Sequence, residues 1–139
     1  MEKPVILKTY TRIFTRDVDL SLGLLRQLHG AEPHFRTRFR DWELAGIGDI
    51  LLVGGTDESL APIRGSIGPL IVDDIDRTRQ ELEAAGATIT MLLDDAPTGR
   101  GFYARHPDGN SVEYIQWTPE LVERWIEAPR RAGKLASQL

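Results

Sequence analysis

The chain has 139 residues, of which 41% are hydrophobic and 27% charged, and its formal net charge is −4 at pH 7. This length and balance predict one folded domain with a packed core and exclude a largely disordered chain. The acidic balance provides no basic surface for nucleic acid, and the lack of cysteine excludes disulfides and thiolate metal sites. No segment reaches the roughly 18 apolar residues that a membrane helix needs, and the N-terminus is not typical of a signal peptide. We therefore expect a cytoplasmic protein that binds neither nucleic acid nor a membrane.

The first half of the sequence begins with a strand and a helix. Residues 5–15 are rich in β-branched and aromatic side chains, which favours a strand. Asp17 is a suitable N-cap for the helix that follows, and Gly30 is a suitable stop. The leucines that recur at helical spacing between them are Leu20, Leu24, Leu25 and Leu28. Further strands are expected at residues 35–44 and 49–53, followed by a linker at residues 54–66.

The same order of signals then returns in the second half. A short apolar strand at residues 67–72 precedes a helix that starts at Asp73-Asp74-Ile75-Asp76 and stops at Gly86. Strands are expected at residues 87–93, 102–105 and 111–117, with a Pro/Gly-rich loop at residues 96–101. Because Arg16-Asp17-Val18-Asp19 holds the matching place in the first half, two βαβββ modules in tandem explain the pattern.

The C-terminal part predicts one more helix. Thr118 is a suitable N-cap, Pro119 occupies the first helical position, and the apolar positions that follow form an amphipathic stretch ending near Pro129. We expect Trp125 in this helix to dock on its own domain rather than on a second subunit. Residues 130–139 form a polar tail.

The most informative stretch is the turn Pro107-Asp108-Gly109-Asn110 and the strand after it. Proline presets φ and Asp-Gly tolerates a positive φ, so these residues favour a tight turn. The strand then places Glu113 among Val112, Tyr114 and Ile115. A carboxylate buried without a partner is costly, so Glu113 is either paired with Arg12 or Arg105 or has a function.

Three elements together resemble the vicinal oxygen chelate superfamily, which holds glyoxalase I, bleomycin-resistance proteins, fosfomycin-resistance enzymes and extradiol dioxygenases. They are the tandem strand–Asp–helix–Gly units, the segment Leu70-Ile71-Val72-Asp73-Asp74-Ile75-Asp76, and Gly101-Phe102-Tyr103 running into Pro107-Asp108-Gly109-Asn110-Ser111-Val112-Glu113. The resemblance implies an α+β fold in which tandem βαβββ modules form a curved mixed sheet around a concave pocket, with helices outside. The modules would span about residues 5–55 and 66–117 of a domain at 1–118, followed by an extra C-terminal helix and tail at 119–139.

In many members of that superfamily a metal sits on four side chains, one from the first and one from the last strand of each module. The matching positions here are Tyr10, about Leu51, Ile67 and Glu113, and only Glu113 is of a family ligand type. A divalent metal needs several nitrogen or oxygen ligands, so we predict neither a metal site nor another cofactor. The histidines that a metal could still recruit are His29, His34 and His106.

Strand alternation sorts the side chains that would line the pocket if Glu113 faces its interior. The result is a mostly apolar and aromatic site with a few polar groups, which is the usual composition of a small-molecule site. The predicted lining residues are Tyr10, Arg12, Phe14, Leu51, Ile67, Pro69, Ser111 and Ile115, with Trp42, Tyr103 and Arg105 as further candidates.

These features favour a metal-free protein that holds an apolar or aromatic small molecule, as drug-sequestering members of the superfamily do. The first alternative is a metal-independent isomerase, cyclase or lyase, with Glu113 as general acid or base and Arg12 or Tyr10 stabilising an oxyanion. Two further alternatives are a divalent-metal-dependent glyoxalase- or dioxygenase-like enzyme with altered ligands, and a structural domain. The resemblance also implies a homodimer and leaves the identity of the ligand open.

Overall fold

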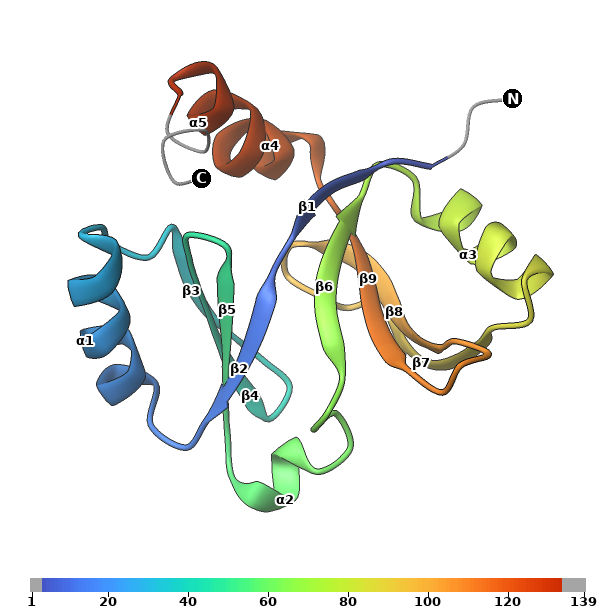
Figure 1. Cartoon of the computed structure of the whole chain (residues 1–139), viewed down its shortest axis with the longest axis horizontal. Helices are drawn as coiled ribbons and strands as arrows, with labels where there is room; N and C mark the ends of the chain where they lie inside the picture. The colour runs from blue at the N-terminus through green and yellow to red at the C-terminus, as the bar shows by residue number, and fades with distance from the viewer. Residues whose placement is uncertain (1–3, 134–139) are drawn as a thin grey trace.

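The computed structural model describes residues 4–133. These residues form two curved mixed sheets, one with the strand order β1-β6-β9-β8-β7 and one with the order β2-β5-β4-β3 (Figure 1). The strands are β1 (Ile6–Thr9), β2 (Thr11–Thr15), β3 (Phe35–Phe39), β4 (Trp42–Ile47), β5 (Ile50–Gly54), β6 (Ile67–Val72), β7 (Thr88–Leu93), β8 (Gly99–Arg105) and β9 (Ser111–Trp117). The helices are α1 (Val18–His29), α2 (Asp57–Leu60), α3 (Ile75–Ala84), α4 (Pro119–Val122), the π-helix η1 (Glu123–Glu127) and α5 (Ala128–Arg131).

Each half of the chain repeats one topology. In the first module β2 and α1 are followed by β3, β4 and β5, and in the second β6 and α3 are followed by β7, β8 and β9. In both modules the first strand lies parallel to the last and the remaining neighbours are antiparallel. The predicted tandem βαβββ fold is therefore confirmed.

The predicted strand at residues 5–15 belongs to both sheets. Its first part, β1, pairs antiparallel with β6 of the second module, and its second part, β2, pairs parallel with β5 of the first. The change of partner falls at Tyr10, whose backbone N–H donates to the carbonyl of Pro69 at 3.1 Å. One extended segment therefore joins the two modules along their common edge (Figure 1).

The two long helices begin in the same way. The side chain of Asp17 accepts a hydrogen bond from the Leu20 N–H, and the side chain of Asp74 accepts one from the Arg77 N–H. These contacts satisfy amide groups that have no partner within a helix, which is why both helices start at these acids. Gly30 ends α1 with a φ of 64°, a backbone conformation that glycine adopts without strain.

Three hydrophobic clusters define the layers of the molecule. Helix α1 packs on the outer face of the first-module sheet, and α3 packs on the outer face of the second-module sheet (Figure 1). The third cluster lies between the sheets and contains residues from both modules together with Ile126 of the C-terminal helical segment. The inner faces of the sheets therefore face one another across the central core, where the pocket was expected.

The C-terminal segment α4–η1–α5 covers one end of this core. Trp125 stacks on Phe35 with ring centroids 4.8 Å apart, and Ile126 is fully buried. The prediction that Trp125 docks on its own domain is confirmed. The helical segment ends at Arg131, slightly beyond the predicted end, so it includes the first two residues of the predicted tail at 130–139. Residues 134–139 of that tail lie outside the described residues.

Three local predictions are wrong. Residues 35–44 form the hairpin β3–β4 rather than one strand, because the turn places Arg40 at a φ of 55° without a glycine or proline to signal it. The linker contains the short helix α2, and β8 begins at Gly99, inside the predicted loop. Of the leucines that predicted α1, only Leu25 is buried.

None of the helices in the described residues is long and apolar enough to cross a membrane.

Candidate functional site

A small cavity of about 40 Å³ lies between the two sheets. This volume accommodates a few water molecules in the conformation described. The side chains around it are mostly apolar and aromatic. They are Tyr10, Arg12, Phe35, Phe39, Trp42, Leu44, Leu51, Val53, Ile63, Pro69, Leu93, Thr98, Tyr103, Glu113, Ile115 and Trp117.

The structure brings together most of the residues that alternation placed in the pocket. Those that line the cavity are Tyr10, Arg12, Trp42, Leu51, Pro69, Tyr103, Glu113 and Ile115. Those that do not line it are Phe14, Ile67, Arg105 and Ser111.

The four residues outside the cavity have different reasons for being there. A register irregularity between Ile67 and Leu70 breaks the alternation of β6, so Ile67 pairs with Val112 on the helix-facing side and is 47% exposed. Arg105 and Ser111 pair with each other at the last position of β8 and the first position of β9. Phe14 lies further along β2, where the guanidinium of Arg64 covers its ring at 5.5 Å.

Several lining residues were missed because the hairpin β3–β4 was missed. Phe35 and Phe39 alternate with Arg36 and Arg38 along β3, so that the phenylalanines face the core and the arginines face away. The alternation of arginines along this strand could have placed the phenylalanines on the inner face. Ile63 follows α2, which the sequence did not predict.

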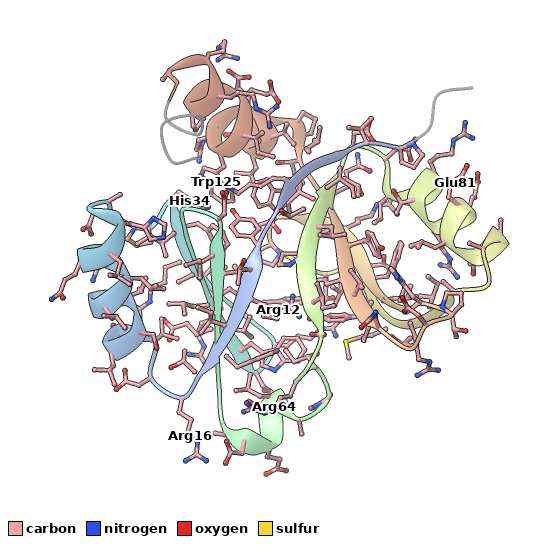
Figure 2. The ribbon with its side chains drawn as sticks, in the orientation of Figure 1. Arg12, Arg16, His34, Arg64, Glu81 and Trp125 are labelled. Atoms are coloured by element: carbon pink, nitrogen blue, oxygen red, sulfur yellow. The ribbon has the colours of Figure 1, made fainter. Side chains whose placement is uncertain are left out.

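A buried ion pair in the cavity wall joins the two modules. The Arg12 guanidinium on β2 donates to the Glu113 carboxylate on β9, and the two side chains are 2% and 12% exposed. The same guanidinium donates to Ser66 Oγ at 2.6 Å and to the Tyr103 hydroxyl at 2.9 Å. Figure 2 shows Arg12 between the sheets. Of Arg12 and Arg105, the two arginines considered as partners of Glu113, Arg12 is the one that forms the ion pair.

One donor of this network has no acceptor. Among the described residues, Arg12 Nε is the only buried side-chain nitrogen or oxygen without a hydrogen-bond partner. Leaving a buried donor unpaired costs about 1–3 kcal/mol. An acceptor oxygen within reach of Arg12 would therefore be stabilising.

Burial and the neighbouring charge shift the pKa of Glu113 in opposite directions. Burial raises the pKa of the Glu113 carboxyl, while the Arg12 guanidinium pulls it down. Burial and the neighbouring Glu113 carboxylate both raise the pKa of Tyr103, which keeps its phenol protonated. With Arg12 and Glu113 both ionised, the wall carries no net charge and still offers hydrogen-bonding groups to the cavity.

A second polar cluster lies beneath the C-terminal helical segment. The Tyr10 hydroxyl and His34 Nε2 are 2.6 Å apart. The His34 and Trp125 rings pack edge to face, with their centroids 5.7 Å apart (Figure 2). The buried Lys8 ammonium lies 4.8 Å from the centre of the Tyr10 ring and 2.7 Å from Asp49 Oδ1. Burial and then the Lys8 charge lower the pKa of His34 to about 4, so this imidazole is neutral at pH 7.

The residues at the superfamily's metal positions do not fit a divalent ion. The Tyr10 hydroxyl contacts His34, the Glu113 carboxylate is bound by Arg12, and Leu51 and Ile67 carry no donor. His29 ends α1 on the surface, and His106 Nε2 lies 2.8 Å from the Tyr114 hydroxyl. Within residues 4–133, no three histidine, aspartate or glutamate side chains are grouped as a metal site would need.

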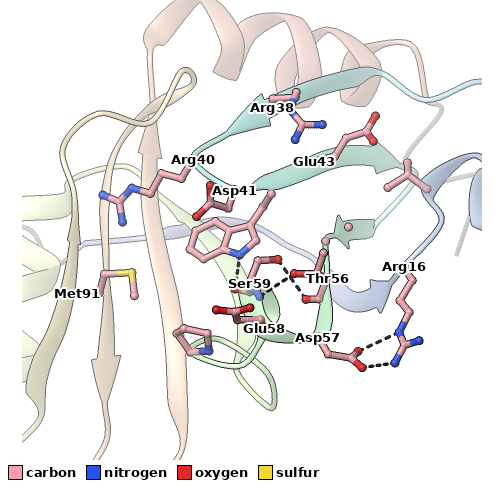
Figure 3. Close-up of a pocket in the computed structure, with 15 residues that line it drawn as sticks. Arg16, Arg38, Arg40, Asp41, Glu43, Thr56, Asp57, Glu58, Ser59 and Met91 are labelled. Atoms are coloured by element: carbon pink, nitrogen blue, oxygen red, sulfur yellow. Dashed lines mark hydrogen bonds and ion pairs between the residues drawn. The ribbon is translucent and has the colours of Figure 1, made fainter.

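An open surface depression of about 1070 Å³ lies next to the cavity (Figure 3). Charged side chains surround it, including Arg16, which forms an ion pair with Asp57. Trp42 lines both the depression and the cavity, and its indole N–H donates to the Ser59 carbonyl at 2.8 Å. One aromatic side chain therefore belongs to the wall between the two spaces.

Comparisons with known proteins support the fold. The family model of the Glyoxalase/Bleomycin resistance protein/Dioxygenase superfamily matches residues 70–114. An uncharacterized protein from Methanosarcina mazei is 31% identical, with 82% of this chain and 94% of that one covered and a TM-score of 0.73. No curated protein matches the sequence.

Two more distant structures share the fold. Methylmalonyl-CoA epimerase from Mycobacterium tuberculosis is 19% identical, with 81% of this chain and 89% of that one covered and a TM-score of 0.62. A glyoxalase/bleomycin resistance protein/dioxygenase superfamily member from Vibrio splendidus 12B01 is 18% identical, with 79% and 98% covered and a TM-score of 0.50. The repeated modules, the family model and these structures agree: the chain belongs to the glyoxalase/bleomycin resistance protein/dioxygenase superfamily.

Proposed function

We propose that this protein binds an apolar or aromatic small molecule between its two sheets without a metal. The observation that carries the proposal is the Arg12–Glu113 pair. Arg12 occupies the one carboxylate that a metal could have used, and it leaves a neutral polar group in an otherwise apolar and aromatic wall. A few directional polar groups in an apolar surround are what small-molecule sites use to orient a ligand.

The unpaired donor indicates what the ligand should carry. Arg12 Nε has no acceptor among the described residues, and the Tyr103 hydroxyl lies beside the same guanidinium. A carbonyl, ether or hydroxyl oxygen on the ligand would satisfy that donor. Because Arg12 and Glu113 already neutralise each other, an uncharged ligand binds without leaving a charge unpaired.

Binding requires the cavity to widen. Drug-sized ligands occupy roughly 300–1,000 Å³, whereas the cavity measures about 40 Å³. Trp42 is the natural place for widening, because it lines both the cavity and the open depression and makes one side-chain hydrogen bond, to Ser59. Rotation of its indole would join the two spaces.

The test is a fluorescence titration with uncharged aromatic compounds that carry one carbonyl or hydroxyl group. Trp42 and Trp117 line the cavity, so a bound ligand should change the tryptophan emission saturably. Leu51→Phe fills the cavity and should weaken binding by about tenfold or more, since the ligand and the added ring compete for one space. Leu92→Phe, at a residue that is 49% exposed, is the control and should bind like the wild type. Equal affinity in all three proteins, or no saturable signal, contradicts the proposal.

A metal-independent acid–base enzyme is the second candidate, and one observation favours it. Burial raises the pKa of Glu113, which moves this carboxyl toward the range useful for proton transfer. Tyr103 and Arg12 would then stabilise an oxyanion. Glu113→Gln separates the two functions: it should abolish turnover of a substrate but leave saturable binding of the same compound.

A further inference from the structure

The two sheets are joined along one side of the molecule and open along the other. On the joined side, β1 and β2 form one continuous segment that pairs with both modules, and β2 lies beside β6. On the open side, β3 and β7 are the outer strands of their sheets, and the described residues form no strand pairing between them. The open side is therefore where the modules can separate without breaking a sheet.

Arg40 connects the two modules on the open side. It lies in the turn of the β3–β4 hairpin, and its guanidinium donates to the Asp95 carboxylate at 2.8 Å and to the Leu92 carbonyl at 3.0 Å. Leu92 belongs to β7, and Asp95 belongs to the turn that follows this strand. Figure 3 shows Arg40 pointing from the hairpin toward the strand that carries Met91. One side chain of the first module thus holds the outer strand of the second.

The backbone at position 40 is unfavourable for an arginine. Phe39 and Trp42 pair with each other, so Arg40 and Asp41 form the hairpin turn between them. The favoured two-residue hairpin turns require a positive φ, which glycine adopts without strain. Among the described residues, Arg40 is the one residue other than glycine that has a positive φ, at 55°. An arginine strains this turn, and what its side chain contributes is the contact with the second module.

Residues on both sides of this contact line the cavity. Phe39 and Trp42, which flank the turn, are lining residues, and so is Leu93, the neighbour of Leu92 on β7. The Arg40 guanidinium also lies over the Phe39 ring, 4.9 Å from its centre. Moving the hairpin away from β7 would therefore move two walls of the cavity apart, which is the widening that a ligand needs.

We propose that Arg40 is a clasp on the binding site: the modules hinge at their shared strand, and a ligand enters when Arg40 releases Asp95 and the Leu92 carbonyl. The proposal rests on the proposed function, because it names the route to that site. The side chains of Arg40 and Asp95 are 35% and 62% exposed, so water and salt screen their attraction. A contact this weak can open and close while the chain stays folded.

The first test measures the opening without a ligand. The chain contains no cysteine, so an introduced thiol is the only one that iodoacetamide can label. Val53→Cys places a thiol in the cavity wall, and Val72→Cys is its matched control beneath α3, since both valines are 1% exposed. Adding Arg40→Ala should raise the labelling rate of Val53→Cys about fivefold and leave that of Val72→Cys unchanged. Added salt should accelerate labelling of Val53→Cys only when Arg40 is present.

Two further variants separate the clasp from a general loss of stability. Asp95→Asn removes the charge but keeps the contact with the Leu92 carbonyl, so it should give a smaller acceleration than Arg40→Ala. Arg38→Ala removes another exposed arginine of the same hairpin and should leave the labelling rate unchanged. Equal acceleration at Val53→Cys and Val72→Cys, or no acceleration at Val53→Cys, would overturn the proposal.

The second test follows the exchange of a ligand, with an uncharged aromatic ketone from the fluorescence titration as the probe. The clasp closes the cavity with or without a ligand inside, so Arg40→Ala should raise the association and dissociation rates by similar factors and leave the dissociation constant nearly unchanged. Stopped-flow tryptophan fluorescence measures both rates. Saturable binding with rates that Arg40→Ala does not change would overturn the clasp and leave the proposed function standing. Faster labelling of Val53→Cys without saturable binding would support the opening at Arg40 and overturn the proposed function.

Discussion

At the scale of single residues, Arg12 holds the two modules together. It lies on β2 of the first module, and its guanidinium donates to Tyr103 and Glu113 on β8 and β9 of the second. The sequence placed Arg12 in the pocket by alternation and named it as a partner for Glu113, because a buried carboxylate needs a cation. The contact between Tyr10 and His34 was beyond sequence reasoning, because His34 lies outside any predicted strand and nothing local fixes its direction.

Removing one member of the ion pair should cost much more than removing both. Glu113→Leu leaves the buried Arg12 charge uncompensated and should lower the free energy of unfolding by about 3 kcal/mol. Arg12→Met combined with Glu113→Leu removes both charges from the apolar surroundings and should be more stable than either single variant. Urea unfolding of the four proteins measures the coupling. Strict additivity of the single effects would contradict a direct pair.

The neutral His34 should make stability fall on the acid side of neutrality. Its folded pKa of about 4 lies below the ordinary histidine pKa of 6.5, so the unfolded chain binds the proton more tightly. The contribution of His34 to the free energy of unfolding is complete above pH 6.5 and is lost as the pH falls toward 4. For a pKa shift of this size the loss is roughly 3 kcal/mol. His34→Gln retains an acceptor for the Tyr10 hydroxyl but does not titrate. The difference in unfolding free energy between wild type and His34→Gln should therefore depend on pH across this interval, and a constant difference would contradict the assignment.

At the scale of elements, the sequence predicted the repeated strand–helix order because its signals are local. Asp17, Gly30 and Asp74 act through hydrogen bonds or backbone angles of their own neighbourhood, so their effect does not depend on the rest of the fold. The hairpin β3–β4 and the outward direction of Leu20, Leu24 and Leu28 on α1 were missed because they depend on tertiary context. Arg40 adopts a positive φ, and an arginine in the sequence does not indicate a turn. Helical spacing alone cannot tell which leucine stripe faces a sheet.

The C-terminal helical segment should be part of the cooperative fold. Ile126 is fully buried in the cluster between the sheets, so Ile126→Ala should lower the free energy of unfolding by about 3 kcal/mol. Val122→Ala, at a half-buried position of the same segment, is the matched control and should cost distinctly less. Urea unfolding followed by circular dichroism measures both. A loss at Ile126 no larger than the loss at Val122 would show that the segment is peripheral.

At the scale of the whole molecule, the fold brings the inner faces of two similar sheets together and places the Arg12–Glu113 ion pair between them. The pocket's location between the sheets could be expected from the resemblance to the superfamily. Its volume could not, because the size of a cavity depends on the rotamers of Phe35, Phe39 and Trp42, which are set only when both modules pack. The same limit applies to the identity of a ligand.

Divalent metals should leave the stability of the whole protein unchanged. The donor set at the superfamily's metal positions is reduced to a carboxylate already bound by Arg12, so Zn²⁺, Mn²⁺ or Mg²⁺ should find no preferred site in the folded state. A thermal-unfolding scan of chelator-treated protein, with and without each ion, should give one midpoint. A midpoint that rises with metal concentration would reveal binding to the folded state and contradict this expectation.

The strand that changes sheets at Tyr10 has a consequence for how the molecule unfolds. Since β1 is an edge strand of one module and β2 an edge strand of the other, neither module can detach without losing a strand or stripping one from its neighbour. Two repeats joined by a loose linker could melt one after the other. Two repeats that share one strand should instead open together, so that backbone amides on both sides of Tyr10 exchange their hydrogens only when the whole chain unfolds.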